Sequence, residues 1–230
     1  MIPLCLVTGF LGSGKTTLLS RWADRYRDRR VVFLVNEFSP ADVDGEVLSP
    51  TLENLVTIAG GSIFCRCKIG QFIDAMDQIH QAADRERIEG VIIEASGVAD
   101  PSVFRTMLHE AGLADHFTVT RVVAVVDPGR FNKLIHTLDA VRGQVRGADT
   151  VILNKIDLYD EATITEAHAQ VAELTPTAEV LRTRFADVDL EAFDPASLPQ
   201  VDGGLALCAD PNYARLRITT DAPLDLDAVR

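Results

Sequence analysis

Residues 9–16 read Gly-Phe-Leu-Gly-Ser-Gly-Lys-Thr and match the pattern G-x4-G-K-[ST] of a phosphate-binding loop. The apolar run Ile2–Val7 precedes the loop and the helical pattern Thr17–Tyr26 follows it, which is the strand–loop–helix context that the motif requires. In such a loop the backbone N–H groups form a concave set of donors, and the start of the helix adds a positive dipole. This stretch therefore predicts a site for the phosphates of a nucleoside triphosphate.

The side chains of this loop have distinct expected roles. We expect Lys15 to reach the β- and γ-phosphates and the hydroxyl of Thr16 to ligate Mg²⁺. The other predicted nucleotide contacts in this stretch are Gly9, Gly12, Ser13, Gly14 and Thr17.

Seven short apolar runs alternate with helical patterns along most of the chain. They are nearly continuous in Val, Ile and Leu, which is typical of strands buried on both faces of a parallel sheet. Segments such as Phe72–Ile79 and Glu161–Leu174 are long enough to be crossover helices. The pattern predicts a P-loop NTPase of the α/β class, with a doubly wound, mostly parallel sheet flanked by helices. The expected strands are Ile2–Val7, Val31–Val35, Leu55–Ile58, Val91–Ile93, Val122–Val126, Val151–Leu153 and Val180–Leu181.

A second motif indicates which base is bound. Asn154-Lys155-Ile156-Asp157 follows an expected strand about 140 residues after the phosphate loop and matches the N-K-x-D pattern of GTPases. The Asp157 carboxylate can accept hydrogen bonds from guanine N1–H and the 2-amino group, and adenine does not present these donors in that arrangement. A site that leaves such a buried carboxylate unpaired discriminates strongly against the wrong base. We therefore expect guanine, with Lys155 lying along the plane of the base.

The stretch 91–97, Val-Ile-Ile-Glu-Ala-Ser-Gly, is an apolar run that ends in a carboxylate. Glu94 stands where an acid commonly holds Mg²⁺ directly or through water, and Gly97 would let its N–H approach the γ-phosphate. The competing interpretation is a solvent-facing Glu at the end of a strand.

Three further residues are candidate ligands for a transition metal. Cys65 and Cys67 have a C-x-C spacing that lets both thiols face one ion, and Glu37, directly after an expected strand, could add a carboxylate. Two cysteines do not complete a tetrahedral site. The alternative is therefore a pair of unligated thiols in a loop.

Taken together, these motifs resemble the CobW family of P-loop GTPases, which are relatives of the UreG and HypB metal-insertion proteins. The resemblance covers about residues 2–195. It implies a SIMIBI-class G domain, slow GTP hydrolysis, and delivery of Zn²⁺, Co²⁺ or a similar metal to a client protein, often through nucleotide-dependent homodimers. The matching segments are 9–17, 35–38, 60–61, 92–101, 125–127 and 148–158, with Gln144 before the last.

One departure from the family concerns the cysteines. The family signature after the Gly-Gly pair is C-x-C-C, and the four aligned residues here are Ser-Ile-Phe-Cys at 62–65. Cys65 is retained and Cys67 lies two residues beyond it. The departure leaves the expectation of a GTPase intact and weakens that of a metal carrier.

The chain is expected to have two parts. Residues 1–195 form the predicted GTPase domain, and residues 196–230 read as a linker and the first strand of a truncated or absent C-terminal domain. The formal net charge of −12 argues against nucleic acid as a partner, and no apolar run reaches the roughly 20 residues of a membrane helix. A cytoplasmic location is the expectation.

Five arginines between positions 21 and 30 form a basic cluster. It reads either as a solvated helix face or as a contact for an acidic partner.

The expected function is that of a GTP-binding protein with slow, Mg²⁺-dependent hydrolysis that serves metal delivery or metalloenzyme maturation. Its partners would be GTP and a client metalloprotein or cofactor-dependent enzyme. The alternatives are a GTPase switch for a cofactor-dependent enzyme without free metal, a regulatory module that binds nucleotide without turnover, and an ATP-using P-loop kinase. The kinase would not need residues 154–157.

Overall fold

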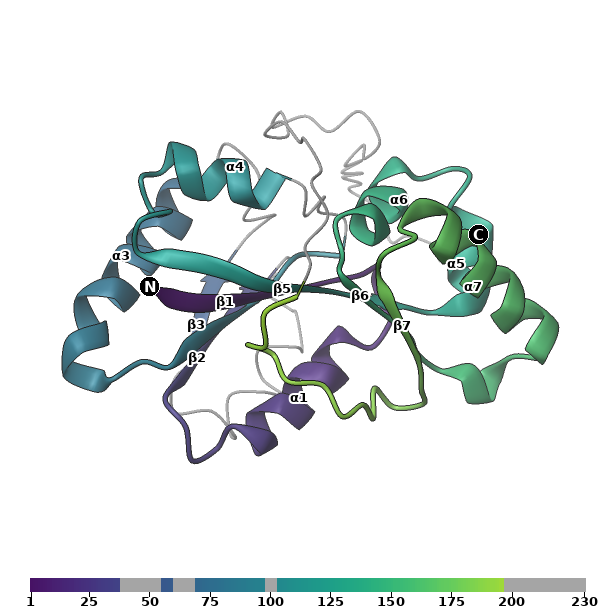
Figure 1. Cartoon of the computed structure of the whole chain (residues 1–230), viewed down its shortest axis with the longest axis horizontal. Coiled ribbons are helices and arrows are strands. Elements are labelled where there is room, and N and C mark those ends of the chain that lie inside the picture. The colour runs from purple at the N-terminus through teal and green to yellow at the C-terminus, as the bar shows by residue number, and fades with distance from the viewer. Residues whose placement is uncertain (38–54, 60–68, 98–102, 197–230) are drawn as a thin grey trace, which may run out of the picture.

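The computed structural model describes residues 1–37, 55–59, 69–97 and 103–196. They form a parallel sheet of seven strands in the order β3-β2-β4-β1-β5-β6-β7 (Figure 1). The strands are β1 (Ile2–Thr8), β2 (Val31–Glu37), β3 (Leu55–Ala59), β4 (Gly90–Glu94), β5 (Phe117–Val126), β6 (Thr150–Leu153) and β7 (Glu179–Arg182).

The expected strands are all present, and the doubly wound α/β architecture is confirmed. The largest difference is β5, which begins at Phe117 rather than Val122. Residues 118–120 are only half-buried, so they lack the continuous apolar character that marks the rest of the strand.

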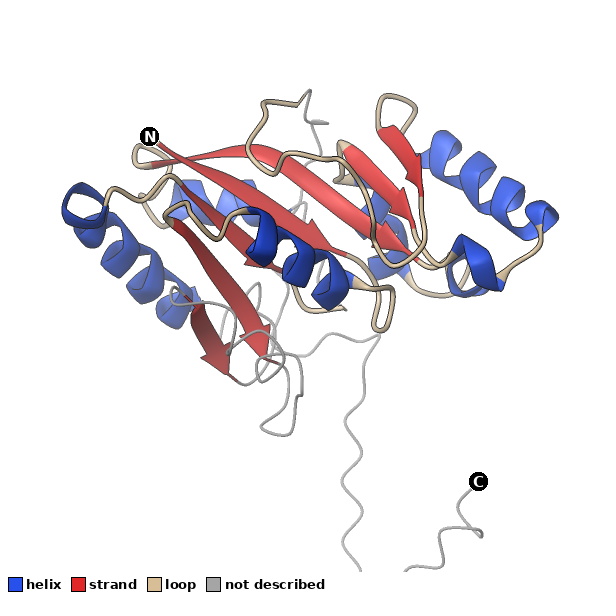
Figure 2. Cartoon of the chain, turned by 90° about the horizontal axis from the view of Figure 1, so that it is seen from below, coloured by secondary structure: helices blue, strands red, loops and turns tan. Residues whose placement is uncertain are grey.

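Helices cover both faces of the sheet (Figure 2). The helix that follows the phosphate loop is α1, and the expected helix over residues 161–174 is present with those bounds. The short helices α5 and α6 were not expected from the sequence. In α5, the Pro and Gly of the first turn interrupt the apolar periodicity that indicates a helix. The helices are α1 (Lys15–Arg25), α3 (Ile69–Glu86), α4 (Val103–Glu110), α5 (Pro128–Leu134), α6 (Asp139–Arg146) and α7 (Glu161–Leu174), with the 3₁₀ turn η1 (Ile156–Leu158).

Alternate side chains of the strands enter two separate cores. In β1, Leu4 and Leu6 join the core that packs against α3 to α7, whereas Cys5 and Val7 join the core under α1. This is the pattern of strands buried on both faces, and it fixes the register of β1 at the centre of the sheet.

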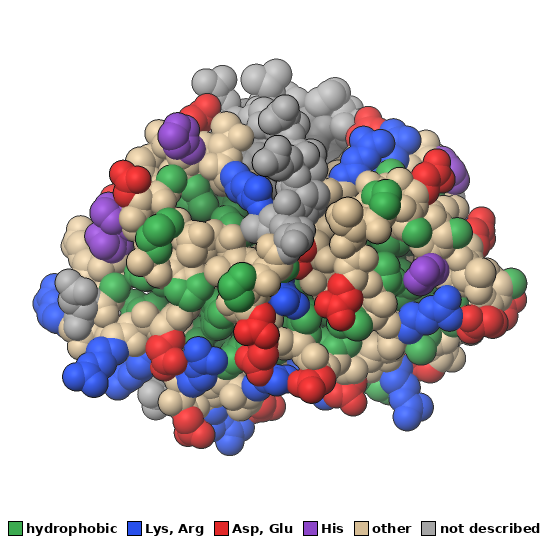
Figure 3. Space-filling model, viewed as in Figure 1, with side chains coloured by type: hydrophobic (Ala, Val, Ile, Leu, Met, Phe, Trp, Pro, Cys, Tyr) green, Lys and Arg blue, Asp and Glu red, His purple; other side chains and the backbone are tan. Residues whose placement is uncertain are grey.

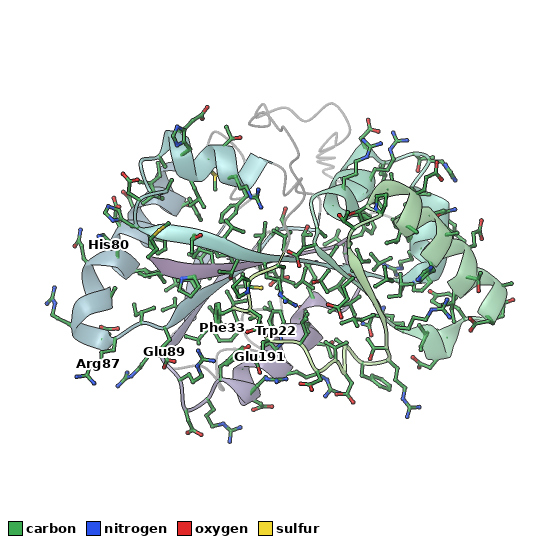
Figure 4. All side chains as sticks on the ribbon, in the orientation of Figure 1. Trp22, Phe33, His80, Arg87, Glu89 and Glu191 are labelled. Atoms are coloured by element: carbon green, nitrogen blue, oxygen red, sulfur yellow. The ribbon has the colours of Figure 1, made fainter. Side chains whose placement is uncertain are left out.

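Residues 183–196, which we call the closing segment, complete the core under α1. Ala186, Leu190 and Ala192 are buried there, and the indole N–H of Trp22 donates to the carbonyl of Leu190 at 3.2 Å. Trp22 and Glu191 lie on the same side of the sheet in Figure 4.

The basic cluster on α1 pairs with acidic residues of this same segment. Arg21 binds Asp187 at 2.9 Å, and Arg25 binds Asp189 at 2.9 Å and also Glu191. Acidic and basic side chains are interspersed along the lower margin of the molecule in Figure 3. These ion pairs lie within the chain and at its surface, so both arginines belong to a solvated, salt-bridged helix face, and a contact with an acidic partner molecule stays a prediction.

No helix in the described part of the chain is both long and apolar enough to cross a membrane.

Candidate functional site

The phosphate loop leaves the carboxyl end of β1 and runs directly into α1, whose first residue is Lys15. Gly9, Gly12 and Gly14 have φ angles of 139°, 72° and 112°, so the loop uses backbone conformations that side chains disfavour. At Gly14 the space is also restricted, since a Cβ would lie 2.2 Å from Nδ2 of Asn154. The loop thus depends on glycine for its shape and for close contact with the base motif.

Four side chains hold the carbonyl oxygens of this loop. Engaging the carbonyls in this way suits an anion site, which is formed by backbone N–H groups. The bonds run from Lys15 Nζ to Gly9 O (3.0 Å), Arg130 Nη1 to Leu11 O (2.9 Å), Lys155 Nζ to Gly12 O (2.5 Å) and Asn154 Nδ2 to Ser13 O (2.9 Å).

Lys15 and Glu94 face one another beneath the loop. Their charged atoms are 3.9 Å apart, and their side chains are only 7% and 6% exposed. Glu94 ends β4, which pairs with β1, so the sheet itself brings this carboxylate to the phosphate loop. The solvent-facing interpretation of Glu94 is therefore wrong. Thr16 follows Lys15 and is half-buried, whereas Thr17 is exposed.

Three buried hydroxyls mark the same place. Among the described residues, the hydroxyl oxygens of Thr8, Ser13 and Ser96 have no hydrogen-bond partner although each lies below the surface. They stand at the end of β1, in the phosphate loop and just after β4. Buried polar atoms without protein partners are uncommon, and hydroxyls at a set of N–H donors suit phosphate oxygens and a hydrated cation. Thr16 and Glu94 are the residues that would hold Mg²⁺ here, and the ion would offset phosphate charge.

Gly97 lies against the phosphate loop on the side of β4. A Cβ at this position would come within 2.8 Å of the backbone nitrogen of Leu11. The buried side chain of Gln144, in α6, donates to the carbonyl of Gly97 at 3.0 Å. The structure therefore brings Gly97 to the loop, as its expected role requires, and gives Gln144 a positioning role.

The base motif is bonded to both the phosphate loop and the closing segment. Asn154 is buried and donates to Ser13, while its carbonyl oxygen accepts the N–H of Ala186 at 2.8 Å. Asp157 lies in the 3₁₀ turn with an exposed side chain, whereas the sequence suggested a buried carboxylate. A carboxylate that reads a base must be accessible to it, so this exposure agrees with the expected role.

Asp127, at the end of β5, is a buried hub that sequence reasoning did not identify. Its carboxylate is 3.4 Å from Nζ of Lys155, accepts the hydroxyl of Tyr159 at 2.6 Å and caps α5 through the N–H of Arg130. The bond to Asp127, followed by burial, raises the pKa of Tyr159 to about 12. The only available signal was the Val-Val-Asp stretch at 125–127, which gave no indication of the partners of its carboxylate.

The candidate transition-metal ligands are placed only in part. Glu37 is the last residue of β2, but its side chain, Cys65 and Cys67 lie outside the described residues. Within the described residues, no group of three or more His, Cys, Asp and Glu side chains could hold a metal ion. Cys5, the one cysteine among the described residues, is buried in the core, and this burial raises the pKa of its thiol.

Curated proteins similar to this chain include a zinc chaperone and a GTPase. Zinc chaperone YjiA of Escherichia coli (strain K12) is 28% identical over 192 residues, which cover 82% of this chain and 59% of YjiA. Zinc-regulated GTPase metalloprotein activator 1 of Schizosaccharomyces pombe is 26% identical over 199 residues, which cover 82% of this chain and 47% of that protein. The chain thus spans less than two thirds of the length of either relative.

Two solved structures share the fold. The crystal structure of Zn(II)-bound YjiA GTPase from E. coli has a TM-score of 0.59 at 22% identity, covering 84% of this chain and 60% of that one. HypB from Helicobacter pylori in complex with nickel has a TM-score of 0.57 at 19% identity, covering 81% and 80%.

Residues 3–182 match the family model described as CobW/HypB/UreG, nucleotide-binding domain. This match takes in the phosphate loop, Glu94 and the base motif, all of which the structure places at the carboxyl edge of one sheet. The chain therefore belongs to the CobW/HypB/UreG family.

Proposed function

We propose that the chain binds GTP with Mg²⁺, hydrolyses it slowly, and uses the nucleotide state to control delivery of a metal such as Zn²⁺ or Co²⁺. The observation that carries the proposal is the bonding of the base motif to the phosphate loop. Asn154 and Lys155 both donate to loop carbonyls while the nearby Asp157 stays exposed. One rigid unit thereby sets the spacing between the phosphate site and the base site, as selection of guanosine nucleotides requires.

The metal part of the proposal is supported by sheet order and by the relatives. Strand β2 lies beside β4, so Glu37 and Glu94 end neighbouring strands at one edge of the sheet. The relatives named above include a zinc chaperone, and one neighbouring structure holds Zn(II). A γ-phosphate over β4 would therefore lie next to β2, the strand that ends at the candidate ligand Glu37. Nucleotide state and metal affinity would then be linked, each changing the other by the same factor.

Hydrolysis is proposed to be slow without a partner or a second copy. The sequence has Val98 after Gly97, and no residue near it is an evident choice to position the attacking water. Multiple-turnover phosphate release at low rate from GTP and not from ATP would support this part. Absence of turnover would favour the regulatory module, and equal use of ATP would favour the kinase.

The first test is a chelator-competition titration of Zn²⁺ and of Co²⁺ with the protein loaded with GTP or with GDP. We expect tight binding that changes with the nucleotide and is lost in a Cys65→Ala/Cys67→Ala double variant. Cys208→Ala is the matched control and should bind as the unaltered protein does. No binding beyond Mg²⁺ in either state would contradict metal carriage and leave a GTPase switch that serves a cofactor-dependent enzyme.

A further inference from the structure

Phe185 has an exposed ring and lies near the start of the closing segment, whose backbone is bonded to the base motif. In the described part of the chain the exposed large apolar side chains are Met1, Leu11, Leu158 and Phe185. Apart from the N-terminal Met1, they belong to the phosphate loop, to the residue after Asp157 and to the closing segment. Among the described residues, the large exposed apolar side chains other than Met1 thus lie at or next to the nucleotide motifs, where a ligand could cover them.

The backbone at this point is held in an unfavourable conformation. Phe185 and Ala186 have φ angles of 55° and 50°, in the left-handed region that residues other than glycine avoid. Two such residues in succession persist only where the surroundings fix them, and strain of this kind is found at binding sites.

Several bonds fix this conformation. The N–H of Ala186 donates to Oδ1 of Asn154 at 2.8 Å, and Arg21 Nε donates to the carbonyl of Phe185 at 2.8 Å. The hydroxyl of Thr183 donates to the carbonyl of Asp187 at 2.7 Å. Ala186 is fully buried, while the Phe185 side chain is 63% exposed. The chain therefore anchors the backbone firmly and presents the ring outside.

Two hydrogen bonds place the turn of the closing segment beside the base motif: the one from Ala186 to Asn154 described above and one from Ile156. The N–H of Ile156 donates to the carbonyl of Thr183 at 3.2 Å, so the turn of the closing segment lies directly beside residues 154–157. Asp157 recognises the edge of a base, and Lys155 is expected along one face. An aromatic ring from the neighbouring turn is suited to the other face, because bases stack on aromatic side chains.

We propose that Phe185 is an aromatic platform on which the guanine base stacks. This inference rests on the proposed binding of GTP and adds a residue that contacts the base. Stacking uses the π-face, which all purines share, and not the edge, which differs between them. Phe185 therefore contributes affinity and Asp157 contributes the choice of base.

The test compares the Kd values for GDP, GTP and ATP in the unaltered protein and in Phe185→Ala. Loss of the stack should raise Kd for GDP and for GTP by the same factor, roughly tenfold, from the usual size of a base–aromatic stack. The preference for GTP over ATP should stay the same, in contrast to Asp157→Asn. Phe185→Tyr should restore affinity, and Phe185→Leu should restore only part of it. The nucleotide-free melting temperature should not change, because the ring is exposed.

A second variant gives a direct spectroscopic signal. Trp22, the single tryptophan of the chain, is buried, and Phe185→Trp adds an exposed indole whose fluorescence a stacked guanine should quench. The change on adding GDP is measured against the signal of Trp22 in the unaltered protein.

Unchanged Kd values in Phe185→Ala, or no quenching in Phe185→Trp at saturating GDP, would overturn the platform and point to a protein partner for the ring. If the unaltered protein binds no GTP at all, the proposed function fails first. The two failures are therefore distinguishable.

Discussion

The two halves of the sheet, on either side of β1, contact the phosphate loop in different ways. The half built from β5, β6 and β7 supplies three of the side chains bonded to loop carbonyls, those of Arg130, Asn154 and Lys155. The half built from β4, β2 and β3 supplies Glu94, close to Lys15, and Gly97, close to Leu11. The loop is hydrogen-bonded to the half that would bind the base in the proposed function, and it lies against the half that would meet the γ-phosphate.

This difference fits the ligand that we propose. The base and the β-phosphate are common to GTP and GDP, so the half that holds them has no need to distinguish the two states. The γ-phosphate is the group that changes, and strand β4 lies between the loop and β2, which ends at Glu37. A switch needs groups that respond differently in the two states. In the proposed mechanism these groups would belong to the half that contains β4 and β2, the strand that ends at Glu37.

The largest expected effect comes from removing the charge of Lys15, which lies in the phosphate loop between the two halves. Lys15→Ala should weaken GTP binding about 100-fold, because charge-assisted contacts to phosphate contribute about 3 kcal/mol. The measurement is equilibrium binding of GTP and GDP by calorimetry. Lys133→Ala removes an exposed lysine from α5 and should leave both affinities unchanged. Near-normal GTP affinity in Lys15→Ala would remove the phosphate-loop assignment.

The next largest effect is expected at Asp127, the buried hub in the half built from β5, β6 and β7. Asp127→Ala leaves Lys155 and Tyr159 without their buried carboxylate and should lower the free energy of unfolding by about 2 kcal/mol. GTP affinity should fall several-fold as well, since Lys155 loses its support. Denaturant unfolding and nucleotide titration measure the two quantities.

The matched control for this prediction is Asp160→Ala. Asp160 caps α7 through the N–H of Thr163 but is exposed and lies outside the hub. Its loss should cost about 1 kcal/mol of stability, as for an ordinary helix cap, and leave GTP affinity intact. Equal effects of the two variants on affinity would show that Asp127 acts only as a cap.

A smaller effect is expected at the carbonyl of Leu11. Arg130→Ala removes a single exposed hydrogen bond to the phosphate loop and should weaken GDP and GTP binding about fivefold, equivalent to about 1 kcal/mol. Arg146→Ala, an exposed arginine in the last turn of α6, is the control. A loss of affinity for GTP alone would show that Arg130 responds to the γ-phosphate, and this would contradict the division of roles between the two halves.

The smallest effect lies away from the nucleotide, in the contacts between α1 and the closing segment. The hydrogen bond from Tyr26, and after it that from Arg25, lower the pKa of Glu191 below its ordinary value of 4.5. The stability from this carboxylate is therefore complete above about pH 4.5 and is lost as the pH falls through the lowered pKa of the folded state. It should amount to less than about 1 kcal/mol, because the pair is partly exposed and screened.

Thermal unfolding between about pH 3 and 7 tests this expectation. Glu191→Gln should reduce the fall of the melting temperature at acid pH. Glu173→Gln, which alters an exposed carboxylate on α7, should not. An identical fall in the unaltered protein and in Glu191→Gln would show that the Tyr26–Glu191 contact adds nothing to stability.

The sequence was sufficient to predict the sheet because its central strands, such as β1, β4 and β6, are largely buried and read as apolar runs. It was also sufficient for the phosphate loop and the base motif, whose residues are close together in the chain. It failed for Asp127, Arg130 and Tyr159, because their partners lie in other segments. Arg130 and Leu11 are 119 positions apart. It left the role of the arginines on α1 open for the same reason, since Arg21 and Asp187 are 166 positions apart.

The closing segment has a practical consequence for anyone who prepares this domain. The family match ends at residue 182, but Ala186, Leu190 and Ala192 still belong to the core under α1. A recombinant fragment cut at that boundary would leave the Trp22 face of α1 open to solvent and remove the turn that holds Asn154. The segment matched by the family model is therefore shorter than the segment needed to complete the core. A fragment with an intact core should extend at least to Phe193, which packs against Tyr26.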